Sequence, residues 1–322
     1  MQPNMQNQVE EPSTKRAKTD GESKMAANTL PDDFKPPPDH YYQGIRMLAI
    51  TPASTFDAIR EMEVREDDIW VVTYPKAGTT WGQEVTSVIV ERADLEKVKS
   101  KSLLARVPYL ELGPLGQQGA TYKMVEQMPS PRLIRTHLPY HLMPKQWFEK
   151  KPKTLYVARN PKDTAVSGWH FTKINHFFVT YDTFSDFFPK YLEGDVIYGS
   201  WFDHNLGFWE HRHDPNVLFV KFEDMKKDLK GQMIRIADFY GYPLPVDKID
   251  AAVEHCTFDK MKKNPMANYS SAHFINHKKG TFHRKGEVGD WKNHFTVGQN
   301  EVFDAVYEDK MRGTGLVFDF EL

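Results

Sequence analysis

The sequence predicts an α/β protein: a single domain with a mainly parallel sheet that is flanked by helices. Short apolar runs typical of buried strands alternate along the chain with helical patterns. A loop of small residues joins the clearest strand to the helix after it. The chain has 322 residues, of which 40% are hydrophobic and 13% aromatic, which is enough to build the core of such a fold. Folds of this class bind ligands beyond the carboxyl ends of their strands, so candidate site residues are expected there.

The strongest strand-loop-helix pattern covers residues 69–90. Residues 69–74 form an apolar run rich in β-branched and aromatic side chains, and the helix from Thr80 places Val85, Val88 and Ile89 on one face. The loop between them brings a glycine, two hydroxyls and a lysine to the positive N-terminus of a helix. This pattern predicts an anion site that resembles a P-loop. An ordinary strand-to-helix turn remains the alternative.

The loop differs from a Walker A motif. That motif places its lysine directly before the Ser/Thr residue, whereas Lys76 lies on the strand side of Gly78. A plain ATP-dependent kinase is therefore a weak alternative, since it should also show carboxylates for Mg²⁺.

Further strand-like runs come later in the chain, and their carboxyl ends carry polar side chains. The remaining predicted elements are strands over residues 132–137, 154–158 and 216–222, a helix from Lys162 and a helix that ends before Gly241. Because the carboxyl ends of parallel strands meet at one edge of a sheet, we expect Lys76, His137, Arg159 and Glu223 to share one crevice.

A second anion site is predicted at the junction of residues 156–171. Arg159 leaves the strand there, and Ser167 lies two turns into the helix, so a guanidinium and a hydroxyl could bind one phosphate monoester. A surface arginine with an exposed serine is the alternative interpretation. Residues 262–290 have weak periodicity and two basic pairs, which predicts a long loop or lid that could bring Arg284 and Lys285 to the same anion.

Composition limits the environment and the partners. Residues 1–38 are polar, charged and proline-rich, which predicts a disordered tail in front of a domain over residues 39–322. No apolar leader or membrane span is apparent, and Cys256 is the single cysteine, so we expect a cytoplasmic protein without disulfides. A net charge of −2 argues against general binding to nucleic acid or acidic membranes. No convincing metal-ligand spacing is present, so no metal is expected.

With these motifs the chain resembles the cytosolic sulfotransferases, a family that uses 3′-phosphoadenosine 5′-phosphosulfate. The resemblance covers roughly residues 39–322. Its specific elements are residues 74–81 (YPKAGTTW), 135–139 (RTHLP), 159–163 (RNPKD), 198–202 (YGSWF), 262–266 (KKNPM) and 284–291 (RKGEVGDW). Their number and order predict a sulfotransferase.

The resemblance implies a cofactor site with three parts. The 5′-phosphosulfate would be held by Lys76, Ala77, Gly78, Thr79 and Thr80. Adenine would lie between Trp81 and Phe258, with Phe222 and Thr257 also in the cofactor site. The 3′-phosphate would be bound by Arg159, Ser167, Arg284, Lys285 and Gly286.

The resemblance also implies a sulfuryl transfer to the hydroxyl or amine of a small lipophilic acceptor, such as a phenol, a steroid or another alcohol. His137 would be the general base, because an imidazole titrates near neutrality, and Lys76 and Arg135 would stabilise charge on the transferring group. The expected acceptor-binding residues are Pro108, Tyr109, Leu112, His137 and Phe171. Arg135 stands where the family often has lysine, and Phe222 stands where many members have tyrosine, so both are expected to alter rate or affinity without abolishing transfer.

Residues 292–301 are similar to the short dimer motif of this family, so a homodimer is expected. The same residues could instead form an exposed helix start with Thr296 as N-cap. A catalytically silent binding protein of the same fold is the second functional alternative, because fold alone does not guarantee activity.

Overall fold

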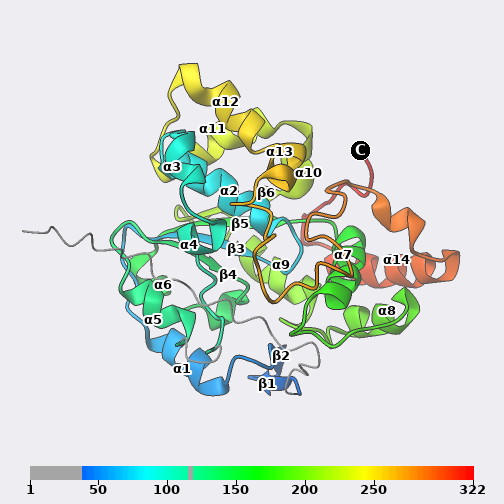
Figure 1. The fold of residues 1–322 in the computed structure, drawn as a ribbon. Helices are drawn as coiled ribbons and strands as arrows, with labels where there is room; N and C mark the ends of the chain where they lie inside the picture. Colours follow the sequence, from blue (N-terminus) through cyan, green and yellow to red (C-terminus); the bar gives the residue numbers. More distant parts are fainter. Residues whose placement is uncertain (1–37, 115–118) are drawn as a thin grey trace, which may run out of the picture.

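A parallel sheet of four strands lies at the centre of the molecule (Figure 1). The structure, a computed structural model, describes residues 38–114 and 119–322, so the predicted tail lies outside the described residues apart from Pro38. The strands run in the spatial order β4-β3-β5-β6. Their bounds are β3 Ile69–Thr73, β4 Leu133–Thr136, β5 Lys153–Ala158 and β6 Val217–Lys221. All three pairings are parallel, which confirms the predicted fold class and the four predicted strands.

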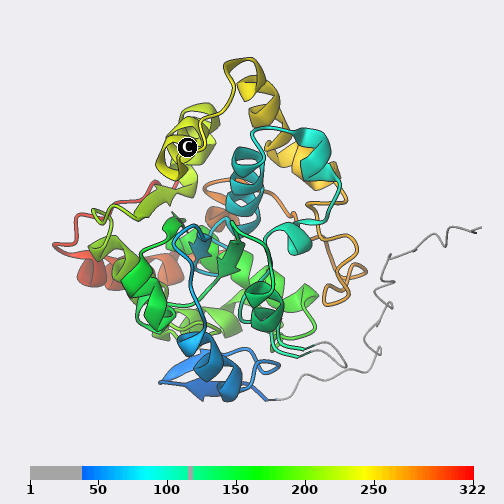
Figure 2. The same ribbon diagram turned by 90° about the vertical axis from the view of Figure 1, so that its left-hand side faces the viewer.

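Helices cover both faces of the sheet, as Figures 1 and 2 show. Because side chains alternate along a strand, Trp70 and Val72 enter one hydrophobic cluster while Ile69 enters the other. The cluster with Ile69 packs against α2 (Thr79–Val90), α11 (Leu229–Tyr240) and α12 (Ile249–His255). The other packs against α1 (Ala53–Glu61), α6 (Lys145–Lys150), α8 (Phe184–Glu193), α9 (Trp201–Glu210) and α14 (Val297–Met311).

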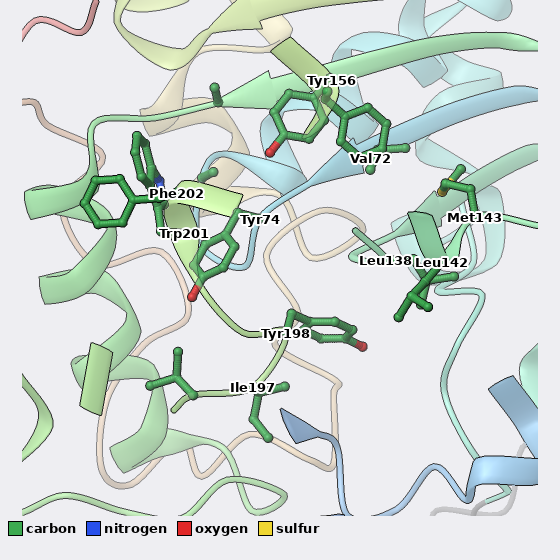
Figure 3. Packing of buried hydrophobic residues seen from close by; sticks show 14 of the residues in the cluster. Val72, Tyr74, Leu138, Leu142, Met143, Tyr156, Ile197, Tyr198, Trp201 and Phe202 are labelled. Atoms are coloured by element: carbon green, nitrogen blue, oxygen red, sulfur yellow. The ribbon is translucent and has the colours of Figure 1, made fainter. Parts of the chain in front are cut away.

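Aromatic side chains in the cluster with Trp70 fix the backbone near the carboxyl end of β3 (Figure 3). Tyr156 stacks on Phe208, with ring centroids 4.4 Å apart. The Tyr74 hydroxyl donates a hydrogen bond of 2.9 Å to the Gly199 carbonyl. Residues 197–202 are therefore held directly beside the loop that comes after β3.

The remaining elements lie between or around these layers. They are β1 (His40–Tyr42), β2 (Ile45–Met47), α3 (Leu95–Lys99), α4 (Leu103–Arg106), α5 (Thr121–Glu126), α7 (Pro161–Ile174), α10 (Phe222–Lys227), α13 (Phe258–Lys263) and the 3₁₀ turns η1 (Tyr140–Leu142), η2 (Val246–Lys248) and η3 (Asp290–Asn293). The antiparallel β1-β2 pair was not predicted, because strands of three residues carry almost no periodic signal. Among the described residues, no helix combines the length and the apolar character that crossing a bilayer requires.

The predicted helix that ends before Gly241 is confirmed as α11, which ends at Tyr240, but it does not follow the strand directly. The segment forms two helices, and Phe222 begins the first of them instead of ending the strand. The break falls at Asp228, whose extended backbone ends α10 and whose carboxylate accepts a hydrogen bond of 2.8 Å from the Gly231 amide. Asp228 is thus the N-cap of α11, a local signal that the apolar periodicity of the region does not contain.

Residues 264–289 form an irregular connection, as predicted, between α13 and η3. Part of this segment is nevertheless anchored, because Tyr269, Ala272 and Ile275 are buried in the hydrophobic cluster with Ile69. Ile275 also forms an isolated antiparallel bridge with Asn175 at the end of α7. The segment is therefore tied to the core near its middle.

Candidate active site

A cavity of about 220 Å³ opens at the carboxyl ends of β3, β4 and β5. It brings together most of the residues predicted for the site, although they are spread over about 210 positions of the sequence. The predicted residues that line it are Lys76, Gly78, Thr79, Thr80, Trp81, Tyr109, Leu112, Arg135, His137, Arg159, Ser167, Phe171, Phe222, Phe258, Arg284, Lys285 and Gly286.

Four predicted residues lie outside the lining, each for a local reason. Ala77 is buried in the core beneath the loop, and the Thr257 hydroxyl turns back to donate to the Glu254 carbonyl. The Pro108 carbonyl accepts a hydrogen bond of 3.0 Å from the Arg135 amide. Glu223, expected in the crevice, is fully buried behind it and accepts a hydrogen bond of 2.8 Å from the Asn160 amide.

The loop after β3 is shaped for close approach of an anion. Gly78 has a φ of +111°, and a Cβ placed on it would lie 3.0 Å from Phe222, so a larger residue would have to displace that ring. Lys76 also adopts a left-handed backbone, with a φ of +69°. Behind the loop, the hydroxyls of Thr73 and Thr79 are hydrogen-bonded at 2.7 Å. The first amides of α2 therefore start directly at this loop, where a helix N-terminus favours negative charge.

Lys76 lies between two aromatic rings. Its ammonium nitrogen is 3.9 Å from the ring centroid of Phe171 and 4.3 Å from that of Phe282. Burial, together with the neighbouring guanidinium groups of Arg159, Arg284 and Arg135, lowers the pKa of Lys76 to about 7. A bound anion would reverse this effect, since it would stabilise the ammonium form.

Arg159 is buried and keeps part of its hydrogen-bonding capacity free. Its Nη2 donates to the Glu287 carbonyl at 2.6 Å, while its Nε has no partner. The guanidinium lies 4.5 Å from the ring centroid of Phe222. An unpaired, buried donor on a cation is costly unless an acceptor can reach it, so this nitrogen is a natural place for a ligand oxygen.

The basic pair Arg284 and Lys285 contacts an internal carboxylate. Asp290 binds Arg284 at 2.6 Å and Lys285 at 2.5 Å. Burial alone would raise the pKa of Asp290, but the hydrogen bonds from Lys285, Asn293 and Arg284 hold it well below its usual range. These two cations therefore line the same cavity as Arg159 and Ser167, and Arg284 lies close enough to Arg159 to affect its charge.

His137 presents a basic nitrogen to the cavity. Its Nδ1 lies 2.8 Å from the Thr73 carbonyl oxygen, which can only accept, so the hydrogen bond places the ring proton on Nδ1 and the lone pair on Nε2. Burial and the nearby Arg135 lower the pKa of His137 well below its usual value. The Glu111 carboxylate accepts a hydrogen bond of 2.6 Å from the His137 amide and holds the backbone. The imidazole is thus neutral and oriented.

Two tyrosines flank the imidazole. The ring centroids of Tyr109 and Tyr198 lie 5.3 and 5.4 Å from that of His137, and the two hydroxyls are hydrogen-bonded to each other. Tyr198 has a φ of +69°, an uncommon conformation for a non-glycine residue. Arg135 is 4.2 Å from the ring centroid of Tyr109 and donates to the Tyr269 hydroxyl at 3.1 Å.

Several lining residues escaped the sequence reasoning. They are Leu48, Pro75, Leu104, Asn175, Tyr198, Lys226, Met261, Tyr269, Phe274, Phe282 and His283. Tyr198 stands in the motif at residues 198–202, which could have marked it. Phe282 and Tyr269 lie in the aperiodic segment, where no pattern separates a cavity residue from a core residue.

The arrangement is suited to the binding and transfer of an anion. Cationic side chains from several separate segments and the neutral imidazole of His137 face a single cavity. Over residues 38–114 and 119–322, no group of three histidine, cysteine or acidic side chains is placed to hold a metal ion.

Comparison with known proteins agrees with this geometry. A family model described as the sulfotransferase domain matches residues 66–315. The chain is 40% identical to human sulfotransferase 1C2 over 278 residues, which are 86% of this chain and 94% of that protein. Among solved structures, retinol dehydratase in complex with androsterone and the inactive cofactor PAP has a TM-score of 0.80 at 27% identity, covering 87% of this chain and 92% of that one. Mouse sulfotransferase SULT7A1 complexed with PAP has a TM-score of 0.71 at 34% identity, covering 85% and 94%.

Proposed function

Because the chain belongs to the sulfotransferase family and is a sulfotransferase, we propose that it transfers a sulfuryl group from 3′-phosphoadenosine 5′-phosphosulfate to a small lipophilic acceptor. The acceptor atom is a hydroxyl oxygen or an amine nitrogen. The solved neighbours with bound PAP support this choice of donor, since PAP is the nucleotide that remains when the sulfuryl group leaves.

One observation carries the proposal: two separate anion-binding groups face one cavity. The loop with Lys76 and Gly78 lines it, and so does the group of Arg159, Arg284 and Lys285. A nucleotide with phosphates on both the 3′ and 5′ oxygens would occupy both groups at once. An ATP-dependent kinase would leave the second group unused.

The proposed reaction assigns one role to each charged side chain. His137 Nε2 takes the proton of the acceptor as the acceptor atom attacks sulfur. Lys76 and Arg135 stabilise the negative charge that develops on the bridging oxygen and on the sulfuryl oxygens. A sulfuryl group carries less charge than a phosphoryl group, so side-chain cations can serve without a metal ion.

The acceptor class is proposed from the aromatic and apolar residues of the cavity lining. Tyr109, Leu112, Phe171 and Tyr198 line it, together with Phe274. An apolar wall with a few polar groups at its end binds a flat or lipophilic molecule through its body and orients its polar atom. Neighbouring structures hold androsterone or retinol, which are lipophilic alcohols. We propose the same chemical class for this chain.

Thermal unfolding with different nucleotides tests the two-anion site. Adenosine 3′,5′-bisphosphate should raise the melting temperature far more than AMP or ATP, because only the bisphosphate neutralises both basic groups and binding to the folded state stabilises it. The Arg284→Gln variant should lose most of this difference while the small shift with AMP stays unchanged. Equal shifts for AMP and the bisphosphate in the natural protein would contradict the assignment.

Two further expectations stay predictions: a cytoplasmic location and a homodimer formed through residues 292–301. Thr296 does cap α14, since its hydroxyl accepts from the Gln299 amide at 3.2 Å, so these residues also have a structural role within one chain. Val297 beside it is 76% exposed, which leaves an apolar side chain available for a partner. Sedimentation of the natural protein tests whether it is a dimer or a monomer. Sedimentation of Val297→Asp tests whether residues 292–301 form the interface.

A further inference from the structure

A buried acidic side chain, Glu84, lies on α2 one turn beyond the phosphate loop and is paired with residues of α4 and α12. Glu84 is fully buried and is not part of the cavity lining. One carboxylate oxygen lies 2.7 Å from His255 Nε2, and the other accepts a hydrogen bond of 2.7 Å from Arg106. None of the three residues takes part in the proposed reaction. Burying an acid is unfavourable unless it is paired, so His255 and Arg106 are needed to keep Glu84 in this position.

His255 lies at the end of α12, three residues before Phe258 of the cavity lining. The connection through Cys256 and Thr257 leads directly into α13, which begins at Phe258. The indole nitrogen of Trp81 donates a hydrogen bond of 2.8 Å to the Cys256 carbonyl. We name residues 255–258 the α12-α13 turn. Helix α2 therefore holds this turn at two adjacent residues, His255 and Cys256.

Trp81 and Glu84 can do this together because they are three residues apart on one helix. Residues at that spacing lie on the same face, so the indole and the carboxylate contact neighbouring parts of the turn. On its other side the turn is limited by Gly286, where an added Cβ would lie 2.3 Å from the Phe258 ring. The position of Phe258 is thus fixed from both sides.

We infer that Glu84 and His255 are positioning residues for the nucleotide base: they hold the α12-α13 turn against α2, so that Phe258 faces Trp81 across the space for adenine. The inference rests on the proposed function and on the adenine site that the family resemblance implies between these two rings. Burial tends to raise the pKa of Glu84, but the hydrogen bond from His255 and the charge of Arg106 lower it overall, so the pairing keeps its carboxylate charged. Two aromatic rings can stack on both faces of a base only if the rings stay at a fixed separation. A turn that was free to shift would change that separation.

Two ligands separate this effect from general damage to the site. Adenosine 3′,5′-bisphosphate contains the base, and methyl ribofuranoside 3,5-bisphosphate has both phosphates but no base. Calorimetric titrations should use the natural protein, Glu84→Met, His255→Phe and the conservative Glu84→Gln. Met and Phe keep side-chain volume and remove the hydrogen bond, whereas Gln retains an oxygen that can accept from His255.

We expect Glu84→Met and His255→Phe to weaken binding of adenosine 3′,5′-bisphosphate about tenfold, which is about 1.4 kcal/mol. Binding of the base-free ligand should stay unchanged, and Glu84→Gln should bind both ligands nearly as the natural protein does. Equal losses for both ligands, or no loss for either, would overturn the inference. If Glu84→Met does not fold, His255→Phe decides the matter.

A matched control breaks another buried pair. Asp68 and Arg132, joined at 2.5 Å and fully buried, lie at the amino ends of β3 and β4, away from the cavity. Asp68→Asn should lower stability without changing the ratio of the two affinities. If the natural protein binds both ligands equally well, adenine does not stack between Trp81 and Phe258, and the role inferred for Glu84 is overturned with that placement. If it binds neither ligand, the proposed function is contradicted instead.

Discussion

His137 combines three properties that a general base needs. Its ring is oriented by the Thr73 carbonyl, its backbone is held by Glu111, and burial keeps it neutral. None of these contacts is readable from the sequence, because Thr73 and Glu111 are 64 and 26 positions away. What could be predicted was the position of the residue at the end of a strand, together with its chemical type.

The His137→Ala variant should lose turnover and keep nucleotide binding. Removing a general base costs roughly a hundredfold or more in rate, whereas the bisphosphate contacts other residues. Steady-state rates with labelled donor and calorimetry with adenosine 3′,5′-bisphosphate measure the two effects. His141→Ala is the control, since His141 is exposed and lies outside the cavity. A turnover close to normal in His137→Ala would exclude this residue as the base.

Lys76 should make nucleotide binding depend on pH. Its pKa in the free protein is about 7, and an anion favours the ammonium form. Below that pH the free protein already holds the proton, so affinity is constant. Above it, binding must take up a proton, and affinity should fall by up to about tenfold per pH unit. Calorimetry between about pH 7 and 9 measures this fall.

Lys76→Arg is the matched variant for this effect. A guanidinium stays charged over the whole range, so the affinity should become independent of pH even if its absolute value changes. The same slope in the natural protein and in the variant would assign the pH dependence to another group.

At the level of elements, the connection between α13 and η3 completes the site. It contributes Tyr269, Phe282, Arg284 and Gly286 to the lining of the cavity. The sequence indicated the basic residues of this segment but not its anchored aromatic residues. A periodic pattern reports burial on a regular helix or strand, and this segment has neither.

Gly286→Ala tests the packing of this segment against α13. The residue has a φ of +66°, and the new Cβ would lie 2.3 Å from the Phe258 ring. The left-handed backbone alone costs about 1 to 2 kcal/mol for a residue other than glycine. We expect weaker binding of adenosine 3′,5′-bisphosphate, because Phe258 must move to make room.

Gly313→Ala provides the control for backbone strain. Gly313 has a φ of +75° and no atom within 4 Å of an added Cβ. This variant should lose stability without losing nucleotide affinity. Similar affinities in both variants would show that the contact with Phe258 is unimportant.

Residues 276–289 should become more protected when the nucleotide binds. Ordering a backbone costs about 1 to 2 kcal/mol per residue, and the cations of Arg284 and Lys285 can offset this cost only when an anion replaces their contact with Asp290. Hydrogen exchange with and without adenosine 3′,5′-bisphosphate measures the change. Residues near Ile275 serve as an internal reference, because they are anchored in the core. Unchanged protection at saturation would argue against a lid.

At the level of the whole molecule, the fold gathers distant residues because parallel strands end at one edge. Alternation of strands and helices was sufficient to predict this sheet and the location of the cavity. Side-chain pairs between helices were not predictable: Glu84 and His255 are 171 positions apart, and each alone reads as an ordinary helix residue. Such pairs depend on how α2 and α12 pack, which the periodicity of either helix does not specify.

Transfer of labelled sulfuryl groups tests directly whether this protein is an active sulfotransferase. The purified protein should be incubated with ³⁵S-labelled 3′-phosphoadenosine 5′-phosphosulfate and a panel of phenols, steroids and other lipophilic alcohols, with a chelator present. At least one acceptor should become labelled, the chelator should make no difference, and one molecule of adenosine 3′,5′-bisphosphate should form for each sulfated product. Tight binding of the nucleotide without transfer to any acceptor would contradict the account and would instead identify a catalytically silent binding protein of this fold.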